Sequence, residues 1–232
     1  MTTSAETVDP SWKGLYRWGG ISALLAGVLS FICIALAFRI GALPSGGEAV
    51  LKYLSGQTTL VYTIYGLIIL GDILGVPFLL ALYLALKGVN KNAMLAATGF
   101  AGLGLVLDLG VAVISWIGLI TLSQNYAAAT SDAQRAAYVA VADYALAVIA
   151  VSGPIFSLVI SSIGTLIVSL VMLKGIFNKA TAYLGIAASI VGLVYGISVF
   201  EPALTILFII AILLSGIWYL LLGSRLYRLG KR

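Results

Sequence analysis

Six long apolar stretches constrain the fold of this chain more than any other feature. They cover roughly residues 18–38, 59–86, 93–122, 143–173, 180–199 and 203–223. A helix needs about 20 mostly apolar residues to cross a hydrocarbon core about 30 Å thick. Charged residues make up only 9% of the 232 positions, against roughly a quarter in a soluble domain. The sequence therefore predicts an all-α membrane protein, a bundle of six transmembrane helices in which residues 1–232 form one transmembrane domain.

The positive charges are divided unevenly between the two sides that alternate loops define. One side collects ten Lys and Arg residues, and the other has only Arg39, Lys52 and Arg135. Short loops rich in these residues stay on the cytoplasmic side. We therefore predict that both termini are cytoplasmic and that residues 1–17 form a polar cytoplasmic segment. Because the formal charge of +5 does not gather on a soluble face, we expect no nucleic-acid partner.

Asp72 and Asp108 are the only charged side chains deep within the apolar stretches. Asp72 lies fourteen residues before the second stretch ends at Leu86. Asp108 lies fifteen residues after the third stretch begins at Ala93. Helices joined by so short a turn are normally antiparallel neighbours, so we expect the two carboxyl groups to meet at mid-membrane. Since no Lys or Arg within the spans neutralises them, at least one should be protonated at neutral pH unless a cation lies between them.

Two interpretations of this acid pair are open. Intramembrane acids commonly mark ion pathways or proton relays, which indicates a proton or cation site at Asp72 and Asp108. Alternatively the pair is structural, with the protonated acids hydrogen-bonded to each other, to backbone or to hydroxyl groups of a neighbouring helix. Gly71 and Gly75 flank Asp72 at a spacing that lets another helix backbone approach closely, and this favours burial against protein rather than lipid.

A row of hydroxyl residues follows the fourth stretch. Ser157, Ser161, Thr165 and Ser169 are spaced by four and so share one slowly drifting helix face. Such hydroxyls commonly pack helices together or bond back to their own carbonyls. The functional alternative is that Ser157, Ser161 and Thr165 form a polar lining for a ligand or a proton path. Pro154, which follows a glycine beside this row, is expected to kink the helix.

The segments outside the apolar stretches predict three local features. Residues 48–54 predict a short amphipathic helix in the membrane interface. Ser131 and Gln134 form a capping box, which predicts that the fourth helix begins outside the bilayer at about Asp132. Trp116 and Trp218 lie near the ends of their stretches, where aromatic residues commonly sit at the membrane–water interface.

The residues that most enzymes use are scarce. The chain has no histidine and one cysteine, Cys33, which removes paired-histidine zinc sites, serine–histidine dyads and an intrachain disulfide. It also has no phosphate-binding or dinucleotide-binding glycine loop. We therefore expect no enzymatic activity, no metal and no cofactor, and an enzyme that uses the two acids alone is the least favoured class.

Three patches of the chain carry a resemblance to known sequences. They are residues 118–126 at the outer end of the third stretch, residues 81–87 at the end of the second, and the turn from residue 173 to 185. In these patches and in its six-helix layout the chain resembles the bacterial and archaeal family catalogued as domain of unknown function 4386. The resemblance implies acids at Asp72 and Asp108 and a location in a bacterial or archaeal cytoplasmic membrane. The arginine that the family tends to carry before the second acid is replaced by Ala101 or an apolar neighbour, and the family implies no established activity.

Two functions are consistent with these features. The first is a small proton- or cation-coupled transporter, or a ligand-responsive membrane protein, built around the acid pair. The second is a non-catalytic accessory subunit of a larger membrane complex, with a membrane protein or a second copy of the chain as partner. A transporter predicts a cavity that reaches the acids, whereas an accessory subunit predicts a dry interior and glycine-rich or aromatic faces turned outward. The lipid bilayer is the expected environment in both cases.

Overall fold

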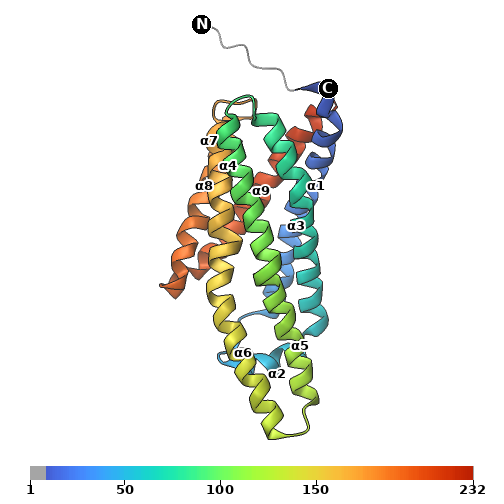
Figure 1. The fold of residues 1–232 in the computed structure, drawn as a ribbon, viewed down its shortest axis with the longest axis vertical. Helices are drawn as coiled ribbons and strands as arrows, with labels where there is room; N and C mark the ends of the chain where they lie inside the picture. The colour runs from blue at the N-terminus through green and yellow to red at the C-terminus, as the bar shows by residue number, and fades with distance from the viewer. Residues whose placement is uncertain (1–8, 232) are drawn as a thin grey trace.

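The computed structural model describes residues 9–231, except for the side chains of Ser157 and Pro202, and all of the regular elements in this range are helical (Figure 1). Short 3₁₀ turns and π-helical segments interrupt or join the long α-helices. In chain order the elements are η1 (Pro10–Trp12), α1 (Lys13–Ile40), α2 (Gly47–Ser55), α3 (Thr58–Leu86), α4 (Lys91–Leu107), η2 (Asp108–Val113), α5 (Ile114–Ala128), α6 (Asp132–Ser152), η3 (Gly153–Ile160), α7 (Ser161–Met172), α8 (Lys179–Tyr195), η4 (Gly196–Val199), η5 (Pro202–Thr205) and α9 (Ile206–Leu229).

Six continuous helical segments are long and apolar enough to cross a membrane. Within the described part of the chain they are Pro10–Ile40, Thr58–Leu86, Lys91–Ala128, Asp132–Met172, Lys179–Val199 and Ala203–Leu229. They match the six stretches that the sequence predicts, except that the fourth predicted stretch ends one residue beyond Met172. The protein is therefore a multi-pass membrane protein that needs a lipid bilayer around it.

The helices pack in an order that places the first and last side by side. α1 packs against both α3 and α9, α4 packs against α7, and α8 packs against both α7 and α9. Glycines allow the closest approach: a Cβ added at Gly20 of α1 would lie 2.5 Å from the backbone nitrogen of Tyr227 on α9. Small residues serve this purpose in membranes because bilayer lipids supply no hydrophobic force between helices.

Two hydrophobic clusters fill the bundle. The first lies in the half that ends with both chain termini, and it includes Tyr16, Phe78, Leu82, Leu86, Met94, Met172, Trp218 and Leu222. The second joins α2, α3, α5 and α6 in the opposite half, and it includes Val50, Leu51, Leu54, Val61, Leu119, Ile120 and Tyr126. We call these two regions the terminal half and the distal half. Along each of the two membrane-crossing segments that carry them, Asp72 and Asp108 lie between residues of the first cluster and residues of the second.

The distal half extends beyond the other helices. The segments Lys91–Ala128 and Asp132–Met172 contain 38 and 41 residues, which at 1.5 Å per residue is roughly twice the thickness of a hydrocarbon core. Figure 1 shows the hairpin between α5 and α6 projecting past the remaining helices. The Ser131 hydroxyl accepts a hydrogen bond from the backbone N–H of Gln134 at 3.3 Å, and the fourth membrane-crossing helix begins at Asp132, as predicted.

The short helix predicted over residues 48–54 is present as α2. It packs against α5 and α6, and its first backbone N–H, at Gly47, donates to the Asp143 carboxylate at 2.7 Å. The Tyr126 hydroxyl donates to Glu48 Oε1 at 2.9 Å, and Glu48 also forms a 2.7 Å ion pair with Lys52. These polar contacts fix α2 on the helices that carry the distal cluster.

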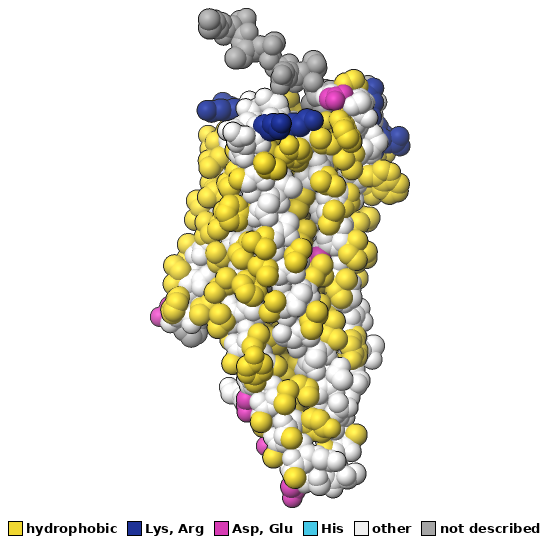
Figure 2. Space-filling model, in the orientation of Figure 1, with side chains coloured by type: hydrophobic (Ala, Val, Ile, Leu, Met, Phe, Trp, Pro, Cys, Tyr) yellow, Lys and Arg dark blue, Asp and Glu magenta, His cyan; other side chains and the backbone are white. Residues whose placement is uncertain are grey.

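Charge also differs between the two ends. In Figure 2 the Lys and Arg side chains gather at the end where α1 begins and α9 ends, together with some acidic atoms, whereas the opposite end shows Asp and Glu side chains without basic ones on this face. This distribution agrees with the sequence count on which the prediction of cytoplasmic termini depends. The side of the membrane that each end faces stays a prediction.

Candidate functional site

The structure brings Asp72 and Asp108 together. Asp72 lies in the middle of α3, and Asp108 lies where α4 passes into η2. The Asp72 carboxyl group is within hydrogen-bonding reach of the Asp108 carboxyl group, and the two groups interact electrostatically. The two carboxyl groups meet because α3 and α4 run antiparallel, as the short turn between them predicts. This pairing places Asp72 and Asp108 at the same level between the two hydrophobic clusters.

The surroundings of the pair are apolar with two tyrosines. Tyr65 of α3 lies close enough to Asp108 for an electrostatic interaction, and Tyr219 of α9 lies close enough to Asp72 for another. Asp72 Oδ2 is buried and has no hydrogen-bond partner among the described residues. The sequence contains no Lys or Arg between positions 52 and 87 or between 91 and 135, so neither acid has a basic residue within its own span.

Two membrane-crossing segments, Lys91–Ala128 and Asp132–Met172, change from α-helix to π-helix near Asp108. The π-helical segment η2 starts at Asp108, and the second π-helical segment, η3, packs against η2 and α4. Pro154 explains η3, because its ring carries no N–H and clashes with the carbonyl one turn back, and this is the place where the sequence predicts a kink. η2 contains no proline, so its wide turn depends on packing. Such turns occur often at functional sites.

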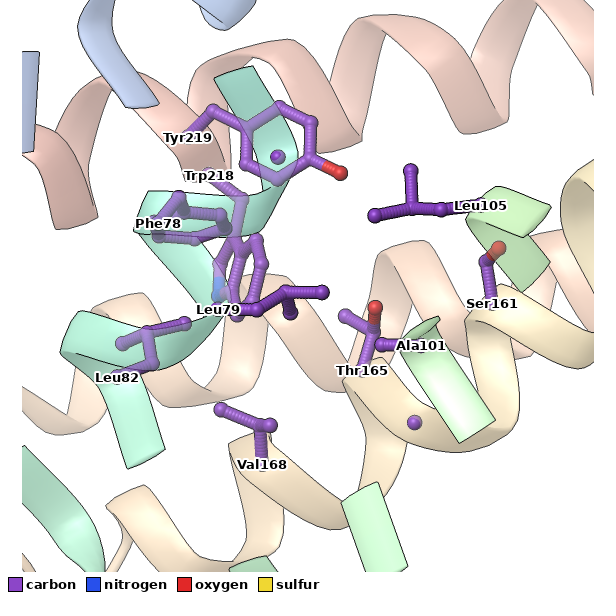
Figure 3. A pocket seen from close by; sticks show the side chains of 12 residues that line it. Phe78, Leu79, Leu82, Ala101, Leu105, Ser161, Thr165, Val168, Trp218 and Tyr219 are labelled. Atoms are coloured by element: carbon purple, nitrogen blue, oxygen red, sulfur yellow. The ribbon is translucent and has the colours of Figure 1, made fainter. Parts of the chain in front are cut away.

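A cavity of about 50 Å³ lies between α3, α4, α7 and α9, and neither Asp72 nor Asp108 is among the residues that line it. It begins one helical turn from Asp72, at Gly75, and extends to Leu82. Figure 3 shows the hydroxyl groups of Tyr219 and Thr165 pointing into the space between these helices, with Ser161 at its edge. The cavity is therefore lined by hydroxyl groups of α7 and α9, and it lies on the terminal side of the acid pair.

The structure places two residues of the predicted polar lining at the cavity, and their role in binding a ligand or conducting protons stays a prediction. Ser161 and Thr165 both line the cavity, while the side chain of Ser157 is outside the part of the chain that the structure describes. Ser161 also has a packing role, because its hydroxyl lies where a Cβ on Gly104 would be. The two interpretations of the hydroxyl row, packing and lining, therefore apply to the same residue.

Two expectations about the site's surroundings are wrong. A Cβ added at Gly71 would meet nothing within 4 Å, and one at Gly75 would meet the Leu105 side chain at 3.2 Å rather than a backbone. The glycine spacing around Asp72 therefore does not bring a second helix backbone close.

Trp218 is not an interfacial residue either, because it is 3% exposed and packs edge-on against Phe78.

Sequence reasoning missed the aromatic residues of the site. Tyr65 stacks on Trp116 with 5.5 Å between ring centres, about two helical turns from the acids on the distal side. Tyr219 packs edge-on against Phe78 at 5.2 Å on the terminal side. Spacing along α3 could have found Tyr65, since it lies seven residues before Asp72 and so on the same helix face. Nothing in the local sequence of α9 indicates that Tyr219 turns toward the acids.

The fold and the site define a six-helix, multi-pass membrane protein with a half-buried pair of acids between its two hydrophobic clusters. The family model described as "Domain of unknown function (DUF4386)" matches residues 19–228. The chain therefore belongs to the DUF4386 family, which confirms the resemblance found in the sequence. No curated protein and no solved structure matches the chain.

Proposed function

We propose that this protein is a proton- or cation-coupled membrane protein, a small transporter or ligand-responsive protein, whose ion site is the pair Asp72 and Asp108. The observation that carries the proposal is that two carboxyl groups face each other between two apolar clusters without a basic residue in either span. A charged residue at the centre of a membrane helix costs about 2.5–3.5 kcal/mol on insertion scales. A bound proton or cation removes much of that cost.

The unpartnered oxygen favours a functional pair over a structural one. A purely structural pair would be expected to use all of its oxygens in hydrogen bonds, because a buried unsatisfied polar group costs about 1–3 kcal/mol. Asp72 Oδ2 has no such partner among the described residues, and it has a cavity one turn away. Both features are expected at a site that exchanges an ion.

The proposal includes no enzymatic step. The chain lacks histidine, and catalysis by the two acids would need a nucleophile or activated water that no sequence motif provides. We therefore infer that protonation or cation binding changes the conformation of the bundle, with the two π-helical segments as the elements that adjust.

The proposal is tested by the thermal stability of the purified protein across pH and in the presence of Na⁺, K⁺ or Ca²⁺. The variants are Asp72→Asn and Asp108→Asn, which keep shape and hydrogen-bonding capacity but cannot ionise. Asp132→Asn is the matched control, because Asp132 is an exposed acid at the start of α6. We expect the parent and the control to share a pH or cation dependence that the two variants lose. Identical profiles for all four proteins would show that the acid pair is structural.

A second candidate function, an accessory subunit, has one observation in its favour. Four glycines of α4, η2 and α5 have nothing within 4 Å of an added Cβ; they are Gly99, Gly102, Gly110 and Gly118. Small residues in membrane helices usually mark helix–helix contacts, and these four make none within the described part of the chain. A stoichiometric partner in mild detergent that is lost in Gly102→Leu but kept in Gly14→Leu, another open position, would favour this function.

A further inference from the structure

Buried polar atoms without partners are unevenly distributed in the bundle. Among the described residues there are five, namely Tyr16 Oη, Asp72 Oδ2, Ser152 Oγ, Ser169 Oγ and Trp218 Nε1. Three of them lie in the terminal half, one is the acid itself, and one lies in the distal half. Buried polar groups normally find a partner in protein or in ordered water, so the terminal half has the greater need for internal water.

These atoms continue a row that starts at the acids. Tyr219 interacts with Asp72 and shares the cavity with Thr165. Ser169 is one turn further along α7, and its hydroxyl and the Trp218 indole nitrogen both lie where a Cβ on Gly185 would be. Tyr16 follows in the first turns of α1, close to the end that carries both termini. Polar groups thus recur from the acid pair toward the terminal end.

In the opposite direction aromatic and aliphatic packing follows the acids directly, whereas on the terminal side the cavity comes first and the packed terminal cluster lies beyond it. The stacked rings of Tyr65 and Trp116 lie on the distal side of the acids, with an angle of 25° between their planes. Beyond them, Leu119 and Ile120 are fully buried in the distal cluster. The acid pair is therefore asymmetric, with a cavity on one side and a stacked aromatic pair on the other.

We infer that the ion of this site is a proton and that it reaches Asp72 and Asp108 from the terminal end, through water held in the cavity lined by Tyr219, Thr165 and Ser161. This inference rests on the proposed ion site and adds the ion and the side from which it arrives. A cavity of about 50 Å³ has room for a few water molecules, each of which needs about 10–15 Å³ of space open to its centre. A space of this size suits a short chain of water molecules that carries a proton.

The lining also favours a proton over a metal ion. Ca²⁺, for example, takes 6–8 oxygen ligands, whereas no group of three or more His, Cys, Asp or Glu residues is found in the described range. Hydroxyls and water can each accept one proton on one side and release another on the other side, so a proton moves through the hydroxyls and waters of the row without net change in any of them. The Trp218 indole N–H only donates a hydrogen bond and does not pass the proton on. It ends on a carboxylate oxygen of the pair, and its source is bulk water at the terminal end.

The test follows the infrared band of protonated carboxyl groups, which needs no knowledge of a transported substrate. In vesicles with one protein orientation, established by labelling a cysteine placed at Ser131, the pH is stepped on one side at a time. The double variant Thr165→Val with Tyr219→Phe removes two hydroxyls but keeps the shape of the cavity. The control is Thr121→Val, because the Thr121 hydroxyl is on the exposed surface of α5 and bonds back to the Ile117 carbonyl at 3.1 Å.

We expect the band to respond to pH on the terminal side and to respond about tenfold more slowly in the double variant, with the control unchanged. A response only to pH on the distal side, or equal rates in parent and double variant, would overturn the inference while leaving the ion site intact. If no titrating band is lost in Asp72→Asn or Asp108→Asn, the proposed ion site itself is wrong. Equal thermal stability of the parent and the double variant serves as the check on folding.

Discussion

The terminal and distal halves of the bundle differ in how most of their polar side chains are partnered, although Ser152 of the distal half also lacks a partner among the described residues. In the distal half, Glu48, Lys52, Tyr126 and Asp143 form hydrogen bonds and an ion pair that fix α2 to α5 and α6. In the terminal half, the hydroxyls of Tyr16 and Ser169 and the indole nitrogen of Trp218 are buried without partners among the described residues. The comparison teaches that polar groups in a membrane bundle stabilise the fold where they are paired. Where they are unpaired and recur from the acid pair toward the terminal end, we propose that they belong to a site.

The largest expected effect comes from the close helix contact in the terminal half. A Cβ at Gly20 would lie 2.5 Å from Tyr227 N and 2.8 Å from the Gly223 carbonyl oxygen, and backbone cannot move aside as a side chain can. We expect Gly20→Val to destabilise the protein by about 3 kcal/mol or more, seen as a large fall in the melting temperature or in folded yield. Gly14→Val, at an open position of the same helix, should leave both unchanged, and equal effects would show that α1 and α9 do not pack so closely.

Removal of one acid should have the next largest effect on stability. Asp72→Leu leaves the Asp108 carboxyl group without its neighbour, which costs about 1–3 kcal/mol. Asp72→Asn preserves a hydrogen-bonding partner and should cost much less. Chemical unfolding of both variants in detergent provides the comparison, and a leucine variant as stable as the asparagine variant would mean that the two carboxyl groups do not face each other.

The paired polar groups of the distal half should contribute locally. Asp143→Ala removes the acceptor of the Gly47 N–H and should cost about 1 kcal/mol, since the bond is partly exposed. Hydrogen exchange should become faster in residues 47–55 and stay unchanged around the acid pair. Faster exchange at Asp72 as well would contradict the separation of the two halves.

The smallest expected effect is a response of α2 to acid. The hydrogen bond from Lys52, followed by the hydrogen bond from Tyr126 and the charge of Lys52, lowers the pKa of Glu48 below its ordinary value. A carboxyl group with a lowered pKa in the folded state adds stability above its ordinary pKa, and that stability is lost as the pH falls through the lowered value. Hydrogen exchange in α2 should therefore increase only in strong acid, and Glu48→Gln should remove this pH dependence.

Much of the fold could be predicted because the membrane leaves few choices. Apolar length defines the six spans, the Ser131 side chain marks the start of α6, and a short turn makes α3 and α4 antiparallel. These are local features, and they also place Asp72 beside Asp108. The sequence therefore predicts the level of the two acids along their helices with no knowledge of the other four spans.

The lateral arrangement of the helices could not be predicted in the same way. The position of Tyr219 near the acids depends on how α9 packs between α1 and α8. A membrane helix is hydrophobic on all of its faces, so its sequence does not indicate which face is buried in the bundle. The open position of Gly71 and the burial of Trp218 were missed for the same reason. The π-helical turn at Asp108 depends on the packing of η3 against it, which no periodicity in α4 indicates.

The most direct test of the acid pair is the number of protons that the purified protein binds as the pH is lowered through neutrality. We expect the parent to take up one proton more than the double variant Asp72→Asn with Asp108→Asn, and Asp132→Asn to match the parent. The extra proton would belong to the two facing carboxyl groups. Equal proton uptake by the parent and the double variant would contradict an exchangeable proton site at Asp72 and Asp108.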